Sequence, residues 1–583
     1  MLSLGLLSHF ALKQANDYKI ALTSMPITAL DVHITAGNSA VLWHLFDLPQ
    51  WSRLALFLAC SVGLLFLFVY IIRRIRTLFS PRLATVTCTT GMVCFLFVYF
   101  EDKIFRDVRE HLAASDTPWG LSVTDKQGWA IQMWSPEGVA QVSSQIGPFP
   151  FFLYSYRLEK DTGAVFFDPA RGTQRTSESE IAEAAREYFS LSSNSQPNIV
   201  LMQLESIFNP NWAFKLNRKV ASFLFDRNDM SRLLLPMRVN IVGGGSWVTE
   251  FEVLTGLDSR LFGYSGYYSH ASVGPHIRGG FPAYLQRRGY LTAAFYPATG
   301  AFVNARKAYS HYGFHHFWDS RDLELSHEWK TTDIELAESF VKKSASFRDN
   351  AFFSFIVTNG AHSPYPCRNF TSSALFSAMF KENDNAVLNC ELNEYIRLMR
   401  KAEEAVRLVL ARLVQIQGKT SRPFVLMVYG DHQPHSFTKT WQWVQGDYDS
   451  VRTSAKKNQT FVHVFSSTRD GKKRLAGEVP ASLLPTVLSS FVANGPDDLY
   501  MAANLHLYRT CGSDLYPAAR SAGMFGVDRV VGAEPVTTGV RVGAPKKITI
   551  ACELAQERTI GSLRATGILK LPGRPDINSA HFR

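Results

Sequence analysis

The chain has 583 residues, of which 46% are hydrophobic, 13% aromatic and 19% charged. This supply of apolar side chains excludes an intrinsically disordered protein. The 38 Gly and 26 Pro residues follow no period, which excludes a collagen-like fibre, and seven Cys residues without a CxxC pair exclude a disulfide scaffold and indicate no structural zinc site. The net charge of +11 is compatible with nucleic-acid binding or with an anionic membrane surface, and hydropathy decides between these two classes.

Two uncharged stretches near the N-terminus predict transmembrane helices. Residues 54–72 and residues 83–100 each reach the length that crosses about 30 Å of hydrocarbon, and the alternative is a pair of buried core helices. The loop between them carries four arginines and no acidic residue, which places it in the cytoplasm by the positive-inside rule. Everything after residue 100 then lies on the outer face. Much of the positive charge therefore reflects topology, and we expect no nucleic-acid partner.

Composition divides the rest of the chain into four segments. Residues 1–53 begin with an apolar stretch but lack the basic start of a signal peptide, so they indicate an unusual insertion or a membrane region without its upstream helices. Residues 101–195 form an aromatic-rich connector, which lies at the lipid headgroups or packs on the next domain. Residues 196–510 are the predicted main domain. Residues 511–583 are rich in Gly, Arg and Lys, and we interpret them as a basic, peripheral tail.

The main domain alternates short apolar runs with longer helix-like stretches. This alternation predicts an α/β fold, with a sheet that helices cover on both faces. The predicted strands are residues 198–204, 290–296, 352–357 and 424–429, and the clearest predicted helix is residues 392–413.

Polar residues follow three of these predicted strands. Glu205 comes after the first, His362 lies just beyond the third, and Asp431 and His432 follow the fourth. Each alone has an ordinary explanation as a helix cap or a turn residue. Ligands bind outside the carboxyl ends of strands in α/β sheets, so we expect these side chains to meet. Carboxylates and imidazoles together predict a site for Mn²⁺, Mg²⁺ or Zn²⁺.

A further segment supplies a hydroxyl to the same edge. Residues 238–242 are predicted as a strand, three glycines follow, and a helix is predicted over residues 247–257. Glycine-rich backbone at a helix N-terminus favours phosphate binding. Ser246, directly after the glycines, is therefore placed to bind a metal or to attack phosphorus. The alternative is that Ser246 only caps the helix. Thr249 is a rival hydroxyl in the first turn.

The order of these residues resembles the lipoteichoic acid synthase branch of the alkaline phosphatase/sulfatase superfamily. That branch also contains the periplasmic glucan phosphoglycerol transferases. The resemblance covers roughly residues 196–500 and implies a membrane-anchored domain with the sheet of that superfamily. Its most specific segments are residues 198–206, 246–251 and 429–432.

The resemblance also implies roles for individual residues. The metal ligands fall on Glu205, Ser246, Asp431 and His432, and the catalytic residues on Ser246 and His362. The chain departs from the family in two ways, because its Arg is displaced by one position in Asn304-Ala305-Arg306 and because we find fewer membrane helices than usual. The substrate-binding residues that we assign are Tyr296, Asn304, Arg306 and His362.

The activity implied by the resemblance is phosphoryl transfer in two steps. Ser246 attacks a membrane phospholipid, with phosphatidylglycerol as the expected donor, and the phosphoglycerol then passes to a glycan acceptor. We expect a divalent cofactor, Mn²⁺ first and Mg²⁺ or Zn²⁺ as alternatives. The expected location is the bacterial inner membrane, with the catalytic domain in the periplasm or outside the cell.

Other functions stay open at this point. They are a phosphoethanolamine transferase, a phosphodiesterase or sulfatase-type hydrolase, and a non-catalytic protein of polysaccharide assembly. A sulfatase needs Cys or Ser in a Cys/Ser-x-Pro-x-Arg context, whereas Ser246 precedes Trp247, Val248, Thr249 and Glu250. An oxidising compartment would allow a disulfide between Cys367 and Cys390 or between Cys511 and Cys552, and free thiols are the alternative.

Overall fold

A computed structural model describes most of the chain between residues 196 and 515. The expected membrane helices at residues 54–72 and 83–100 lie outside the described residues, apart from Tyr70. No helix in the part that is described has the length and apolar character needed to cross a membrane. The described residues are 196–213, 216–262, 264–325, 331–347, 350–363, 365, 386–434, 458–468, 475, 477–492 and 499–515, with 13, 16, 19, 26–28, 31, 70, 143, 151, 152, 155, 552 and 555.

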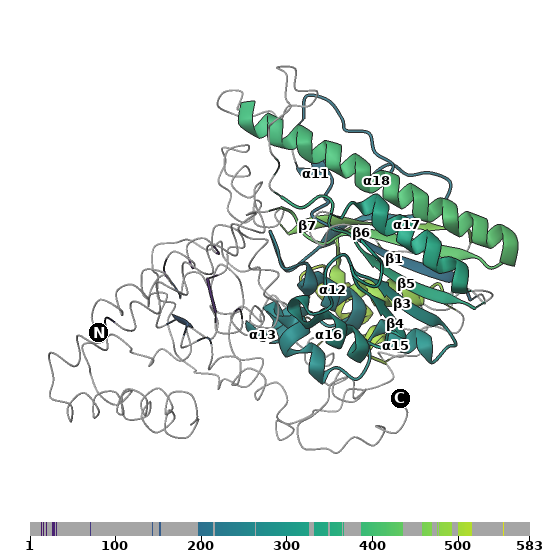
Figure 1. Cartoon of the computed structure of the whole chain (residues 1–583), viewed down its shortest axis with the longest axis horizontal. Coiled ribbons are helices and arrows are strands. Elements are labelled where there is room, and N and C mark those ends of the chain that lie inside the picture. The colour runs from purple at the N-terminus through teal and green to yellow at the C-terminus, as the bar shows by residue number, and fades with distance from the viewer. Residues whose placement is uncertain are drawn as a thin grey trace, which may run out of the picture. The chain divides into compact units, whose positions relative to one another are not determined.

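An eight-stranded sheet forms the centre of this domain, in the order β4-β3-β5-β1-β6-β7-β2-β8 (Figure 1). Its strands all run in one direction except β7, which is antiparallel to both of its neighbours. The strands are β1 (Asn198–Leu204), β2 (Ser231–Arg238), β3 (Leu291–Phe295), β4 (His316–Trp318), β5 (Phe352–Val357), β6 (Phe424–Gly430), β7 (Gln459–Ser466) and β8 (Val479–Pro480).

The sequence pattern predicts the central strands well. All seven residues of β1 are buried, because β5 and β6 flank it and helices cover both of its faces. The predicted strands at β1, β3, β5 and β6 are confirmed. The predicted strand at residues 238–242 is wrong, since β2 ends at Arg238 and a loop leads from there to Ser246. Several residues of β2 stay partly exposed, so it lacks the continuous apolar run of the central strands.

One face of the sheet packs against two long helices. They are α17 (Asp333–Ser344) and α18 (Ala386–Thr420), which lie together above the sheet in Figure 1. Val200, Met202 and Leu204 of β1 point into this core. Thr332 and Glu335 form a capping box at the start of α17, which satisfies backbone donors that the first turn leaves without partners.

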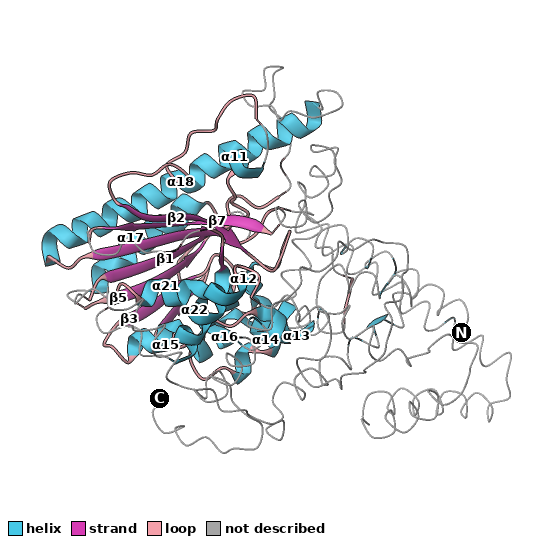
Figure 2. Cartoon of the chain, turned by 180° about the vertical axis from the view of Figure 1, so that it is seen from behind, coloured by secondary structure: helices cyan, strands magenta, loops and turns pink. Residues whose placement is uncertain are grey.

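Another group of helices covers the opposite face of the sheet (Figure 2). Ile199 and Leu201 of β1 enter a second core on this face. The helices include α12 (Ser246–Thr255), α15 (Phe281–Gln286), α16 (Ala305–Tyr312) and α22 (Leu499–Cys511). The remaining helices are α11 (Pro210–Ala213), α13 (Tyr264–Tyr267), α14 (Ser269–Ser272) and α21 (Leu484–Ser489), with 3-10 turns at Ser259–Phe262, Gly274–His276, Phe302–Asn304, Ala345–Phe347 and Ala481–Leu483.

Part of the segment after residue 510 belongs to this second core. Cys511, at the end of α22, forms a disulfide with Cys552, and Ala555 is buried with the core residues. At these positions the segment is not peripheral, contrary to our interpretation of the sequence. Cys390 is disulfide-bonded as well.

A buried histidine makes the stability of this fold depend on pH. His463 is in β7. Its Nδ1 lies 2.8 Å from the Leu224 carbonyl oxygen, and its Nε2 lies 2.8 Å from the Ser231 hydroxyl oxygen. A carbonyl only accepts, so Nδ1 carries the proton and the neutral Nε2 accepts from Ser231. Burial lowers the pKa of His463 from 6.5 to about 4.

We expect the free energy of unfolding to decrease as the pH falls from about 6.5 to about 4, because in this range His463 binds a proton in the unfolded chain and not in the folded one. The full loss is about 3 kcal/mol. Thermal melts of wild type and His463→Gln across this range measure it, because Gln keeps a donor and an acceptor but does not titrate. Parallel pH profiles for the two proteins would contradict the assignment.

Candidate active site

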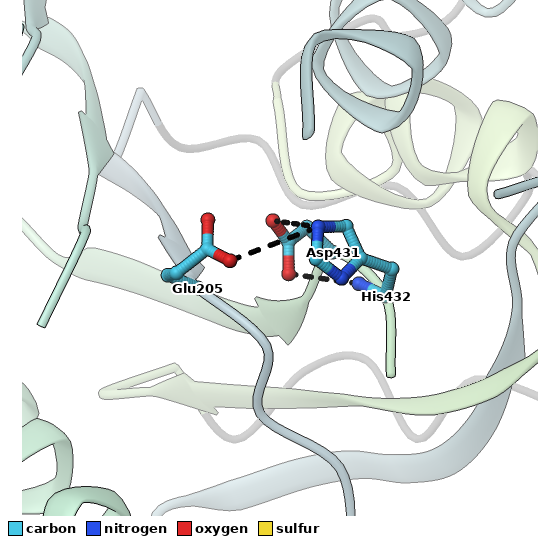
Figure 3. A group of neighbouring side chains, drawn as sticks. All are labelled: Glu205, Asp431 and His432. Carbon is cyan, nitrogen blue, oxygen red and sulfur yellow. Dashed lines mark hydrogen bonds and ion pairs between the residues drawn. The ribbon is translucent and has the colours of Figure 1, made fainter. Parts of the chain in front are cut away.

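Three buried side chains meet at the carboxyl ends of two neighbouring strands (Figure 3). Glu205 follows β1, and Asp431 and His432 follow β6, which pairs with β1 up to Leu204 and Gly430. Their exposed fractions are 4%, 0% and 1%, and one potential ligand atom from each lies within 4.8 Å of the others. The sheet therefore brings these three predicted ligands together, as the strand-end argument requires.

The hydrogen bonds of this cluster leave one carboxylate oxygen without a donor. Asp431 Oδ1 accepts from the backbone N–H groups of Ser206 (2.7 Å) and His432 (2.8 Å), whereas Oδ2 is buried with no hydrogen-bond partner. Glu205 Oε1 accepts from the Ser206 hydroxyl at 2.7 Å. A buried acceptor without a donor is costly unless a cation satisfies it. The cluster therefore fits a divalent metal ion.

The electrostatics of the cluster agree with a cation site. Burial and the charge of Glu205 raise the pKa of Asp431 well above its ordinary value. Burial would also raise the pKa of Glu205, but the charges of His432 and His362 and the hydroxyls of Ser206 and Ser246 lower it overall. Burial lowers the pKa of His432. Two close carboxyl groups with an imidazole are suitable donors for Mn²⁺, Mg²⁺ or Zn²⁺.

The hydroxyl of Ser246 reaches this cluster from a third element. It donates to Glu205 Oε2 at 3.0 Å and lies 3.3 Å from His432 Nε2. Ser246 is the first residue of α12, the N-cap position belongs to Gly245, and no side chain caps the helix. The alternative explanation of Ser246 as an N-cap is therefore wrong.

The rival hydroxyl has a different partner. Thr249 is fully buried one turn further along α12, and its Oγ1 donates to the backbone carbonyl of Asp431 at 2.8 Å. This contact holds the helix against the segment after β6. Of the two hydroxyls, Ser246 is the one in contact with the candidate ligands.

A run of left-handed glycines leads into the helix. Gly243, Gly244 and Gly245 have φ angles of 62°, 76° and 84°. Side chains with a Cβ rarely adopt this conformation, so glycine is needed here. The N–H group of Gly243 donates to the Gln433 carbonyl at 2.8 Å, which ties this loop to the segment that carries Asp431 and His432. Such a backbone at a helix N-terminus favours an anion.

Two predicted substrate-contacting residues lie within electrostatic range of the cluster. His362 is exposed beyond β5, and its charge acts on both Glu205 and His432. Tyr296 is buried directly after β3. Burial, followed by the charges of Glu250 and Glu205, raises the pKa of Tyr296 well above its ordinary value. Both residues therefore lie near the candidate site.

The other two predicted substrate contacts are not joined to the cluster. Arg306 is half exposed and pairs with Asp319 at 2.7 Å and with Asp322 at 2.8 Å. Asn304 occupies the N-cap position of α16 with a positive φ of 63° and forms no side-chain cap. The structure thus places the Arg306 guanidinium in an ion-pair network of its own.

A buried polar network that the strand-end argument did not find supports α12. Glu250 accepts hydrogen bonds from Gln203 (3.3 Å), His270 (3.0 Å) and Tyr309 (2.6 Å). The signal in the sequence was the resemblance segment at residues 246–251, which contains Glu250. The network anchors the helix one turn below Ser246.

We expect Glu250→Gln to lower the free energy of unfolding by about 1–3 kcal/mol, because an amide group then faces donors that a carboxylate accepts from. Thermal or urea unfolding measures the loss. Glu338→Gln, on the covering helix α17 and outside this network, is the control and is expected to change stability by less than about 0.5 kcal/mol. Equal stability of the two variants would show that the network does not support the helix.

The family comparison agrees with this geometry. The sulfatase family matches residues 197–476, a range that begins at β1 and includes Glu205, Ser246, Asp431 and His432. Residues 197–476 are a sulfatase/alkaline phosphatase superfamily domain. The predicted superfamily is confirmed.

Individual relatives of this sulfatase-superfamily domain are distant. An uncharacterized protein of Haemophilus influenzae is 27% identical over 268 residues, which is 44% of this chain and 47% of that protein. Lipoteichoic acid synthase 1 of Bacillus subtilis is 23% identical over 375 residues, 60% of this chain and 51% of that protein. The matches thus span about half the length of these relatives.

Among solved structures, the domain is similar to the phosphoglycerol transferase GacH of Streptococcus pyogenes in complex with sn-glycerol-1-phosphate. The identity is 18%, the coverage is 68% of this chain and 95% of that one, and the TM-score is 0.44.

Proposed function

We propose that the protein transfers a phosphoglycerol headgroup, or a similar phospho-headgroup, from a membrane phospholipid to a glycan through a phosphorylated Ser246. The observation that carries this proposal is the contact of the Ser246 hydroxyl with Glu205 and His432, inside a buried ligand cluster and after a run of left-handed glycines. A hydroxyl in such surroundings is suited to nucleophilic attack on phosphorus. A non-catalytic assembly protein would have no use for this arrangement.

In the first step, Ser246 Oγ forms a bond to the phosphorus of the donor lipid, and the bond from phosphorus to the diacylglycerol oxygen breaks. The proton of Ser246 is released to water, and the leaving alcohol gains a proton from His362, so the step is balanced. His362, exposed within electrostatic range of Glu205, supplies the proton to the leaving oxygen. Glu205, Ser246, Asp431 and His432 would hold a divalent cation, which would lower the pKa of the hydroxyl and neutralise charge on the phosphoryl oxygens.

In the second step, a hydroxyl of the glycan attacks the same phosphorus. The bond from phosphorus to Ser246 Oγ breaks, and Oγ recovers a proton from water. His362, neutral after the first step, takes the proton from the acceptor hydroxyl. The proposed substrate contacts are Tyr296, within electrostatic range of Glu205, and Asn304 and Arg306 at the start of α16.

A sulfatase activity is disfavoured by the residues after Ser246. The sequence lacks the Pro and Arg of the sulfatase motif, and the position four residues on is Glu250, whose carboxyl group is buried in its own hydrogen-bond network.

One experiment tests the proposed function directly. The full chain in detergent or vesicles is incubated with Mn²⁺, a glycan acceptor and phosphatidylglycerol labelled in its glycerol headgroup. We expect diacylglycerol and a labelled glycan. A parallel reaction with labelled phosphatidylethanolamine identifies a phosphoethanolamine transferase, and labelled glycerol phosphate without glycan labelling identifies a hydrolase. No diacylglycerol from either lipid would exclude headgroup transfer.

We also propose that the domain lies outside the cytoplasm, anchored in the bacterial inner membrane. The uncharged stretches and arginine loop of the N-terminal region support this location, and the Cys511–Cys552 disulfide is compatible with it. A phosphatase reporter fused after residue 110 is expected to be active only in this topology. Activity of a cytoplasm-specific reporter at the same position would overturn it.

A further inference from the structure

A buried carboxylate outside the ligand cluster holds the loop that leads to His362. Asp333 is the first residue of α17 and is 3% exposed. It accepts from the backbone N–H of Gly360 at 2.7 Å, and the backbone N–H of Asn359 and the hydroxyl of Thr358 also donate to it. One carboxyl group thus accepts hydrogen bonds from three consecutive residues of the loop after β5.

The same loop is linked to the backbone of a candidate metal ligand. The Thr358 hydroxyl accepts a hydrogen bond from the backbone N–H of Glu205 at 3.1 Å. Because the hydroxyl accepts here, its single proton is left for Asp333, and Thr358 acts on that carboxyl group as a donor that lowers its pKa against the larger, opposite effect of burial. The hydrogen bonds therefore run in one direction, from Glu205 through Thr358 to Asp333. The Thr358 N–H also donates to the Gln203 carbonyl at 3.0 Å, which continues the register with β1.

Close packing keeps the loop against the carboxylate. A Cβ atom at Gly360 would lie 2.6 Å from Asp333 Oδ1, a distance that no side chain tolerates without movement. Ala361, the next residue, is fully buried, and its carbonyl accepts from the Tyr365 hydroxyl at 3.0 Å. His362 then emerges into solvent. The loop is thus fixed on both sides of the point where His362 leaves it.

We propose that Asp333 is a positioning residue of the active site, which fixes His362 through the loop after β5 and Glu205 through Thr358. The inference rests on the proposed function, because it assigns the purpose of this loop to headgroup transfer. The hydrogen bonds described for Asp333 go to the loop after β5 and not to the candidate ligands, so it acts through Thr358 and Gly360. A carboxyl group suits this position, since its two oxygens can accept from several donors at once.

The test compares Asp333→Asn with Glu335→Ala in the full chain. Asn puts an amide group where loop donors need an acceptor, so we expect kcat to fall about 10- to 100-fold with KM for the lipid little changed. Glu335→Ala breaks the capping box of the same helix turn, where Glu335 accepts from Thr332 at 2.7 Å, and it leaves the Asp333 carboxyl group in place. It is expected to lower the melting temperature and to leave kcat unchanged.

A second pair of variants keeps the proposal testable if Asp333→Asn does not fold. Thr358→Val removes the hydroxyl at nearly constant volume and is expected to reproduce the loss of kcat. Thr358→Ser retains the hydroxyl and is expected to restore most of the activity. Equal activity of the Val and Ser variants would overturn the connection through Thr358.

Hydrogen exchange of the full chain gives a readout that does not depend on the substrate. In Asp333→Asn we expect the amides of Asn359 and Gly360 to exchange at least about tenfold faster, with no change there in Glu335→Ala. Unchanged exchange, or faster exchange with wild-type kcat, overturns the positioning role. If the wild type transfers no headgroup, the proposed function fails by itself, and the exchange rates still decide whether Asp333 holds the loop.

Discussion

Ser246→Ala is expected to abolish headgroup transfer, with a loss of at least about 10³-fold, because alanine has no oxygen to form the bond to phosphorus. Ser246→Thr is expected to retain measurable activity because threonine keeps the hydroxyl, although its methyl group adds bulk beside Glu205. The measurement is release of diacylglycerol and labelling of glycan by the full chain with Mn²⁺.

Mass spectrometry after reaction with the lipid donor locates the adduct. Trypsin is expected to release residues 239–260 as one peptide, which contains both Ser246 and Thr249, so fragmentation must assign the position. Thr249→Ala is the matched control, because it removes a hydroxyl bonded to the Asp431 carbonyl and not to the ligand cluster. We expect it to cost about 1 kcal/mol of stability and to keep the adduct. An adduct on Thr249, or a fully active Ser246→Ala protein, would refute the mechanism.

Asp431→Asn is expected to remove both metal binding and transfer. Its amide oxygen can still accept from the N–H groups of Ser206 and His432, so the backbone keeps its contacts. The negative charge is lost, and an amide nitrogen replaces the oxygen that has no hydrogen-bond partner. We therefore expect little change in the cation-free fold and a loss of activity of at least about 10²-fold.

Thermal melting with added Mn²⁺ separates metal binding from activity. At a concentration 100 times Kd, a ligand that binds only the folded state adds about 2.7 kcal/mol of stability, so the melting temperature of the wild type rises. That of Asp431→Asn is expected to stay constant. Asp226→Asn, a surface carboxylate paired with Lys219, is the control and is expected to respond as the wild type does. A full thermal response of Asp431→Asn would move the metal site elsewhere.

Local sequence patterns were sufficient to predict the strands at the centre of the sheet. The strands β1 and β5 coincide with their predicted boundaries, because a parallel strand buried on both faces must be a continuous apolar run. The strand β2 ends where the predicted strand at residues 238–242 begins. It was not recognised because it contains Pro236 and several of its residues are partly exposed. The tail was misjudged at Cys552 and Ala555, because composition over a long segment does not show which single residues enter a core.

For the site, the sequence by itself determined which chemistry was present. Carboxylates and imidazoles follow strands whose carboxyl ends share one edge of the sheet, and a hydroxyl follows a glycine run, so Glu205, His362, Asp431, His432 and Ser246 were expected to meet. Glu205, Asp431, His432 and Ser246 do meet, whereas His362 is exposed beyond β5 and is not part of the cluster.

Only the tertiary structure decided which other residues contact the site and which bind elsewhere. In the structure, Thr249 donates to a backbone carbonyl and Arg306 pairs with Asp319. Asp333 binds the loop that leads to His362. These contacts join residues far apart in the chain, and their geometry follows from how helices pack on the sheet. A hydroxyl, a guanidinium or a carboxylate has many possible partners in a sequence, and packing alone selects the one it binds.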